Sequence, residues 1–125
     1  MLTRSLSDCK EILAGDNTLL RELLHPVRND AAIRYSLAHA KLARGTASLP
    51  HRLKTSEVYY FISGQGRMHV DGEATPVGPE QVLYVPPGAV QHVENTGTDE
   101  LVFLCIVDPA WRAEDEEVLW LAPPL

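Results

Sequence analysis

Short apolar segments alternate with turn-forming residues over most of the chain. From Tyr35 onward, six segments of strand length are rich in Val, Ile, Tyr and Phe, and each is bounded by Gly, Pro, Asn or Asp. They are YSLAHAKLA, EVYYFIS, RMHVDG, QVLYVP, VQHVEN and LVFLCIV. Strands spaced about ten residues apart and separated by turn signals are typical of a sandwich or barrel. The pattern therefore predicts an all-β domain.

The region before Tyr35 has a mixed pattern. Ser7 and Asp8 resemble a helix cap, and the segment that follows ends at Gly15-Asp16-Asn17, so we expect a short helical segment of one or two turns. The next segment, TLLRELLHP, has the leucine spacing of a helix, but Pro26 and the many strand signals nearby favour a strand almost equally. Both alternatives stay open from the sequence alone.

We expect a single domain with three parts. Residues 1–34 form an N-terminal extension that packs on the barrel, residues 35–108 form the barrel core, and residues 109–125 form a C-terminal tail. The tail carries four consecutive acids at 114–117, which we interpret as a solvated face, and then an apolar group at 118–121. This apolar group includes Trp120 and could dock against the barrel or against a partner subunit.

Composition and charge narrow the classes of partner. The chain has 125 residues, 45% of them hydrophobic, and a formal net charge of -6, which argues against a nucleic acid or an anionic membrane surface as partner. No apolar run approaches the roughly 18 residues that span a bilayer, and the first residues do not resemble a secretion signal. We therefore expect a cytoplasmic protein with a small-molecule ligand. Cys9 and Cys105 are expected to be free thiols, with Cys105 serving as a small buried hydrophobe.

A histidine and an acid stand at a spacing that can bring them together between strands. Five residues separate Gly45 from His51, and Glu57 comes six positions after His51. Imidazole nitrogen and carboxylate oxygen are both good ligands for divalent metals. Because successive strand residues point to opposite faces, Gln91 and His92 cannot both point inward.

These residues resemble the two sequence motifs of the cupin superfamily. The first motif is matched by Gly45-x5-His51-x-Leu53-x3-Glu57-x6-Gly64, and the second by Pro86-x-Gly88-x2-Gln91-x3-Asn95. The resemblance implies a small cupin 2 type barrel, that is a jelly roll or double-stranded β-helix, and it also implies a homodimer.

The resemblance also implies a metal site with part of its ligand set replaced. His51 and Glu57 occupy ligand positions, whereas Leu53 and Gln91 stand where the family has histidines. The implied ligands of a divalent ion (Mn, Fe, Ni or Zn) are therefore His51, Glu57 and Gln91, and His92 could replace Gln91 only if a bulge shifted the strand register. Glu57 is the candidate catalytic acid or base. Leu53, together with Tyr59, is a candidate substrate-binding residue.

Two functions remain open from the sequence. The first is a metal-dependent enzyme of small-molecule metabolism, in which the metal polarises the substrate and Glu57 handles a proton. The second is a barrel that binds or senses a small molecule without bound metal and without chemistry. We place the other histidines outside any site: His69 on the outer face, His39 on a strand as a packed or exposed residue, and His25 in solvent.

Overall fold

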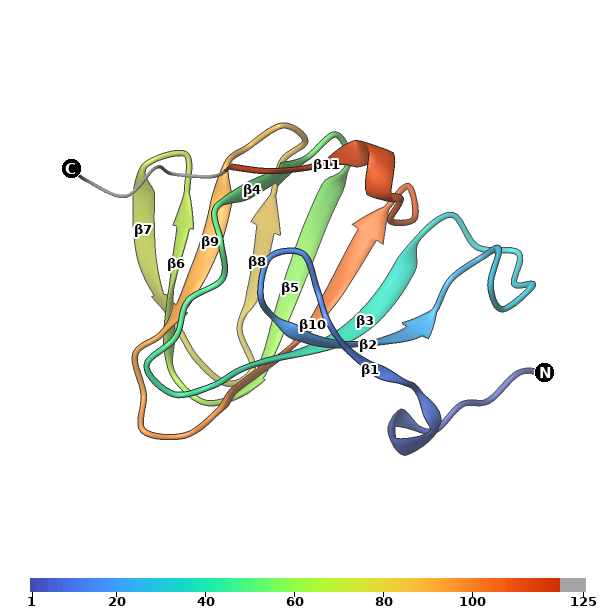
Figure 1. Ribbon diagram of the computed structural model, residues 1–125, viewed down its shortest axis with the longest axis horizontal. Coiled ribbons are helices and arrows are strands. Elements are labelled where there is room, and N and C mark those ends of the chain that lie inside the picture. The colour runs from blue at the N-terminus through green and yellow to red at the C-terminus, as the bar shows by residue number, and fades with distance from the viewer. Residues whose placement is uncertain (120–125) are drawn as a thin grey trace.

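Two antiparallel β-sheets face each other and form a barrel, as the computed structural model shows for residues 1–119, the part of the chain that the structure describes (Figure 1). One sheet has the order β1-β2-β3-β10-β5-β8, with β1 at Glu11–Leu13, β2 at Leu19–Leu24, β3 at Ser36–Leu42, β5 at Ser56–Ser63, β8 at Val82–Val85 and β10 at Leu101–Asp108. The other has the order β11-β4-β9-β6-β7, with β4 at His51–Leu53, β6 at Gly66–Val70, β7 at Glu73–Val77, β9 at Gln91–Asn95 and β11 at Glu116–Val118.

The inner faces of the two sheets form the core. Along β10, buried residues alternate with half-buried ones, so that every second side chain points into the barrel. Three inward aromatic rings, those of Tyr59, Phe61 and Phe103, pack against one another with centroids 5.4–6.0 Å apart. Aromatic contacts at this spacing add to the stabilisation from burial.

The structure confirms the prediction of an all-β jelly-roll barrel. Each of the six segments that we identified contains a strand. The prediction missed the short strand β4 and the strand β7, whose residues are exposed except for Val77 and which includes Pro76. Both strands lack the apolar run that marks the others, because one is three residues long and the other lies at a sheet edge.

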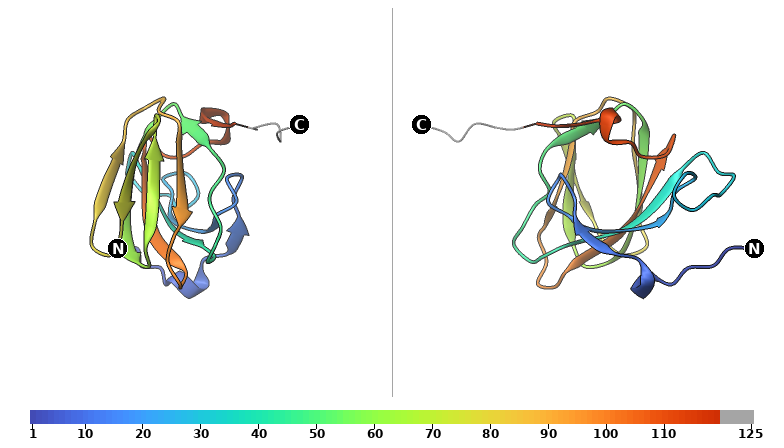
Figure 2. Two further views of the ribbon diagram at one scale, coloured as in Figure 1. Left: turned by 90° about the vertical axis from the view of Figure 1, so that its left-hand side faces the viewer. Right: turned by 45° about the vertical axis from the view of Figure 1, so that its right-hand side comes forward.

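The N-terminal region joins the six-stranded sheet. The expected helical segment is reduced to a single 3-10 turn at Leu6–Asp8, named η1. The segment TLLRELLHP forms strand β2, which pairs with β3 over Leu19–Leu24. A hairpin connects β1 to β2, and its tip lies over one end of the barrel (Figures 1 and 2). The sequence left a helix and a strand open for this segment, and pairing with β3 makes it a strand.

The C-terminal tail continues the five-stranded sheet through β11, which pairs with β4. The acidic run is not uniformly solvated, because Asp115, in the 3-10 turn η2 (Ala113–Asp115), is buried and accepts two hydrogen bonds from Arg112. Trp120 and Leu121, for which we considered docking, lie outside the described residues. Within residues 1–119, no helix has the length and apolar character needed to cross a membrane.

The histidine placements are correct in two cases and wrong in one. His69 lies on the outer face of β6, and His39 lies on β3 opposite Arg21, half-buried and away from the cavity. His25 was expected in solvent, but it is buried. Its Nδ1 accepts a hydrogen bond from the Val27 amide, and its Nε2 donates to the backbone oxygen of Trp111. This partner is distant in the chain, so the sequence gives no local signal of the burial.

Candidate functional site

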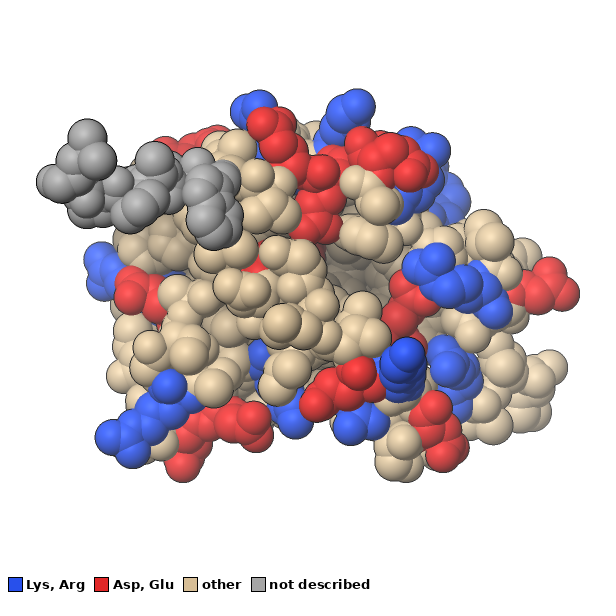
Figure 3. All heavy atoms as spheres, viewed as in Figure 1, with Lys and Arg blue, Asp and Glu red and all other residues tan. Residues whose placement is uncertain are grey.

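A cavity of about 630 Å³ lies inside the barrel between the two sheets. Its volume is within the range of small-molecule binding sites. The face in Figure 3 shows a hollow near its centre, with both acidic and basic side chains close to its rim. The wall is largely apolar and includes Leu53, Val93, Phe103 and Val107. Buried polar side chains lie among these apolar residues, and they carry the chemistry of the site.

His51 lies on β4 with its side chain buried and directed into the cavity. Its Nδ1 lies 2.9 Å from the backbone oxygen of Leu49. Because a carbonyl oxygen only accepts, Nδ1 carries the proton and donates it in this bond. The neutral ring therefore has its lone pair on Nε2, which lies 3.8 Å from Oδ2 of Asp16. This arrangement leaves Nε2 able to accept a proton.

Glu57 lies on β5, in the opposite sheet, and also lines the cavity. Its side chain is 6% exposed, and among the described residues its Oε1 has no hydrogen-bond partner. Burial raises the pKa of this carboxyl from 4.5 to about 7, against the opposing effect of nearby His51. Glu57 can therefore hold or release a proton near neutral pH. The Glu57 side chain lines the cavity, although Oε1 itself is fully enclosed by protein atoms.

Gln91 and Tyr59 form a buried pair that joins the two sheets. Gln91 on β9 is 1% exposed, and its side-chain oxygen accepts a hydrogen bond from the Tyr59 hydroxyl on β5. Its neighbour His92 points outward and stacks on His69. The structure thus decides the choice between these two residues in favour of Gln91. Gln91 does not line the cavity, whereas Tyr59 does.

The side chains at this point do not fit a metal centre. The Gln91 oxygen that would ligate an ion is engaged by Tyr59, and Leu53 has no donor atom. His51 and Glu57 remain, which is fewer than the three protein ligands of a typical catalytic zinc site. Across residues 1–119, no group of three or more His, Cys, Asp or Glu side chains could hold a metal ion. A divalent ion at His51, Glu57 and Gln91 thus remains a prediction that this donor set does not support.

The sequence patterns did not point to Asp16 or Cys105 as site residues, although both line the cavity. Asp16 lies at the tip of the β1–β2 hairpin, where its Oδ1 accepts hydrogen bonds from the amide and hydroxyl of Thr18 at 3.1 and 2.8 Å. Its backbone oxygen accepts from the amide of Leu49. Cys105 lies opposite Tyr59 in β10, and burial raises the pKa of its thiol far above the usual value. Period-two alternation in LVFLCIV was the available signal for Cys105. For Asp16, the sequence offered no signal apart from its position in a predicted turn.

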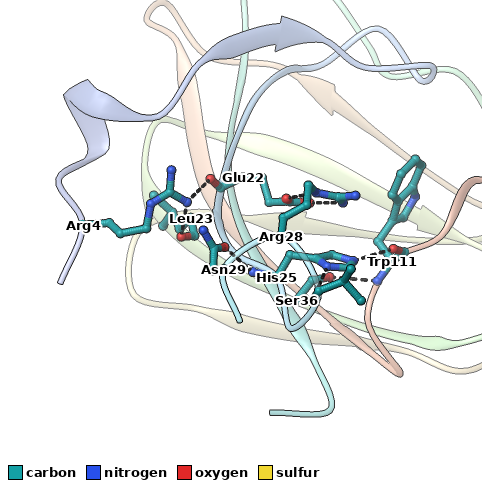
Figure 4. Close-up of polar contacts among 9 residues, drawn as sticks. Arg4, Glu22, Leu23, His25, Arg28, Asn29, Ser36 and Trp111 are labelled. Carbon is teal, nitrogen blue, oxygen red and sulfur yellow. Dashed lines mark hydrogen bonds and ion pairs between the residues drawn. The ribbon is translucent and has the colours of Figure 1, made fainter. Parts of the chain in front are cut away.

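The cavity mouth is held by contacts between the β2–β3 loop and the segment after β10 (Figure 4). His25 Nε2 lies 3.0 Å from the Trp111 backbone oxygen, and the Trp111 amide donates to the Ser36 hydroxyl at 2.9 Å. The indole of Trp111 donates to Glu116 at 2.6 Å. Trp111, Glu116 and Arg28 all line the cavity. These contacts fix both sides of the mouth.

Comparison with known proteins places the chain among cupins. The family model described as "Cupin domain" matches residues 38–107. An uncharacterised protein of Methanocaldococcus jannaschii is 36% identical over 111 residues, which cover 88% of each chain. The oxalate-binding protein of Thermotoga maritima is 31% identical over 71 residues, or 56% of this chain and 59% of that protein.

A solved structure shares the fold of this chain. The polyketide cyclase RemF of Streptomyces resistomycificus superposes with a TM-score of 0.81 at 18% identity, covering 98% of this chain and 87% of that one. At this identity the likeness concerns the fold and not the activity.

Proposed function

The chain belongs to the cupin family, and on that premise we propose that it binds a small organic molecule inside its barrel and exchanges a proton with it through Glu57. The observation that carries this proposal is Glu57, a buried carboxyl that lines the cavity and has one oxygen without a hydrogen-bond partner among the described residues. A buried polar atom without a partner is costly, and a ligand that donates a hydrogen bond would remove that cost.

His51 supports the same proposal. Its Nε2 carries a lone pair when the ring is neutral, and it lines the same cavity as Glu57. A carboxyl and an imidazole that line one cavity can serve as acid and base on one bound molecule. We propose Glu57 as the group that moves the proton, and His51 as the group that accepts a hydrogen bond from the ligand or takes the proton in turn.

The wall of the cavity bears on the size and polarity of the ligand. One relative is named an oxalate-binding protein, which makes a small carboxylate a reasonable first candidate. Oxalate has no apolar surface, however, and would leave Leu53, Val93 and Phe103 in contact with water or with empty space. The wall favours a larger molecule with an apolar body, and we propose Leu53 and Tyr59 as residues that contact it.

A second candidate is a binding module without chemistry. It is favoured by Leu53 and by the Tyr59–Gln91 hydrogen bond, which preserve the shape of the barrel but provide no further reactive group. In that case Glu57 would hold the ligand without exchanging a proton.

The experiment is a melting-temperature screen of the wild type against a library of small hydroxy, keto and amino compounds. We expect a subset with a hydrogen-bond donor to raise the melting temperature of the wild type but not that of Ala38→Phe. Ala38 lines the cavity beside Cys105 on the neighbouring strand, so the phenylalanine ring would project into the cavity and narrow it. Stabilisation that persists in Ala38→Phe, or no stabilisation by any compound, would contradict binding in the barrel.

Proton exchange is then measured on each stabilising compound. Nuclear magnetic resonance in deuterated water reports exchange of carbon-bound hydrogen or conversion of the compound. We expect wild type to accelerate it and Glu57→Gln to abolish it while folding normally. Binding without exchange in wild type would favour the binding module.

The implied homodimer also remains a prediction, and Val82 and Tyr84, which are exposed on edge strand β8, are consistent with it.

A further inference from the structure

Basic side chains gather at the mouth of the cavity although the protein as a whole is acidic. Of the eleven Lys and Arg residues in a chain of formal net charge -6, Arg4, Lys10 and Arg28 line this one cavity. All three are exposed, whereas Glu57 and His51 are buried deeper in the same cavity. The acidic surface as a whole repels an anion, so local cations at the mouth oppose that repulsion where the ligand enters.

The three cationic side chains differ in the contacts that hold them. Arg28 is held by Glu22, whose carboxylate accepts from its Nε and Nη2 (Figure 4). One Nη of Arg4 donates to the backbone oxygens of Glu22 and Leu23 at 3.3 and 2.7 Å, which ties the N-terminal segment to β2. Within the described residues, neither Arg4 nor Lys10 forms an ion pair with a carboxylate.

Four acids also line the cavity: Asp16, Glu22, Glu57 and Glu116. Glu22 is neutralised by Arg28, whereas the hydrogen bonds that Asp16 accepts from Thr18 and Glu116 accepts from the Trp111 indole leave the charges of these two carboxylates in place. Among the described residues, none of these carboxylates lies within ion-pair distance of Arg4 or Lys10. Besides these cations, the cavity lining includes the apolar side chains of Leu53, Val93 and Phe103 and the carboxyl of Glu57.

We propose that the molecule bound in the barrel is an amphipathic organic anion. Its carboxylate, sulfonate or phosphate group lies at the mouth beside Lys10 and Arg4, and its apolar body lies between Leu53, Val93 and Phe103. This inference rests on the proposed function, because it names the chemical class of ligand for the same cavity. The flexible ammonium of Lys10 and the guanidinium of Arg4 suit any of these three anions.

The test compares two fluorescent probes that differ only in charge. Anilinonaphthalene sulfonate is an apolar anion, and phenylnaphthylamine is the same ring system without the sulfonate. We expect the sulfonate probe to bind the wild type more tightly than the neutral probe does. Added salt should lower the affinity for the sulfonate probe, because salt screens the attraction between charges, and it should leave the affinity for the neutral probe unchanged.

The decisive variant is the double substitution Arg4→Gln, Lys10→Gln. We expect this variant to bind the sulfonate probe about fivefold more weakly than the wild type does, as is typical of two partly exposed charge interactions. Its affinity for the neutral probe should equal that of the wild type. The matched control is Arg44→Gln, Arg67→Gln, which makes the same change in net charge at two exposed positions outside the cavity. We expect this control to bind both probes as the wild type does. Lys10→Gln alone is the second variant, since Arg4 also anchors the N-terminal segment.

The outcomes separate this inference from the proposed function. Equal affinity of the two probes, or equal weakening by the variant and its control, would overturn the anion assignment while leaving binding in the barrel intact. Binding of both probes that persists in Ala38→Phe would mean that they bind outside the barrel, and the assignment would fail. If neither probe binds the wild type, the proposed cavity function fails together with it.

Discussion

The barrel carries a histidine and a glutamate on its inside and a second such pair on its outside, and the two pairs have different chemistry. Outside, His69 Nε2 lies 2.7 Å from Glu94 Oε1, and the His69 ring stacks on His92 at 4.2 Å. Inside, Glu57 has an oxygen without a partner among the described residues. The outer pair is partly solvated and its two members contact each other, whereas the inner residues are buried and line the cavity.

This difference follows from burial and not from residue type. Removing water raises the energetic cost of charge, which favours the neutral form of the Glu57 carboxyl. On the outer face, water and the neighbouring side chain meet the same need at little cost. The same two residue types therefore form a surface contact in one place and a candidate reactive site in the other.

The largest expected effect tests whether the inner face carries the stability of the barrel. Phe61 is fully buried between Tyr59 and Phe103, while its neighbour Ile62 is 42% exposed. We expect Phe61→Ala to lower the free energy of unfolding by about 3–5 kcal/mol, because it leaves a cavity in a packed aromatic cluster. Ile62→Ala should cost less than about 1 kcal/mol. Urea unfolding of both variants measures the contrast, and similar losses would refute it.

A smaller effect, dependent on pH, tests the two glutamates. The pKa of Glu57 is raised in the folded protein, so the proton stays bound there while the unfolded chain releases it above pH 4.5. Stability is therefore lost as the pH rises from 4.5 to about 7, by up to about 3 kcal/mol, and stays lower above that range.

Glu57→Gln should remove this loss. The variant should be more stable than wild type at pH 8 and equally stable at pH 4, as measured by urea unfolding across the range. Glu94→Gln is the matched control on the outer face, and we expect it to change stability by less than about 1 kcal/mol. A stability profile of Glu57→Gln that parallels wild type would show that Glu57 does not titrate in this way.

The smallest expected effect is on metal content. We expect protein purified without chelator to contain the same amount of divalent metal as the double variant His51→Ala, Glu57→Ala, because only two of the three implied ligands, His51 and Glu57, line the cavity. Elemental analysis of both proteins measures this. Metal in a one-to-one ratio in the wild type, absent from the double variant, would instead support the site that the sequence motifs implied.

Local pattern was sufficient to predict most of the strands and the direction of their side chains. Alternation with period two predicts that Glu57, Tyr59 and Phe61 share a face, and the structure buries all three. The spacing of the motifs implied His51 as a metal ligand; the residue lines the cavity, and its role as a ligand stays a prediction. These results were predictable because strand geometry depends on neighbours in the sequence.

Contacts between distant segments were not predictable in the same way. Asp16 stands in an ordinary turn, and only the pairing of β2 with β3 brings that turn over the barrel. His25 is buried because Trp111, 86 positions away, provides an acceptor. No local pattern contains either partner, so neither position could be recognised from its own segment.

The sequence by itself therefore determined the jelly-roll barrel and which residues of a strand share a face, because alternation and turn chemistry are local properties. Tertiary structure decided what those residues can do. It paired the Gln91 oxygen with the Tyr59 hydroxyl, left one oxygen of Glu57 without a hydrogen-bond partner among the described residues, and brought Arg4 and Lys10 into the cavity lining. Hydrogen bonding and desolvation depend on which groups are close in space, and contacts between residues far apart in the sequence cannot be predicted from local sequence patterns.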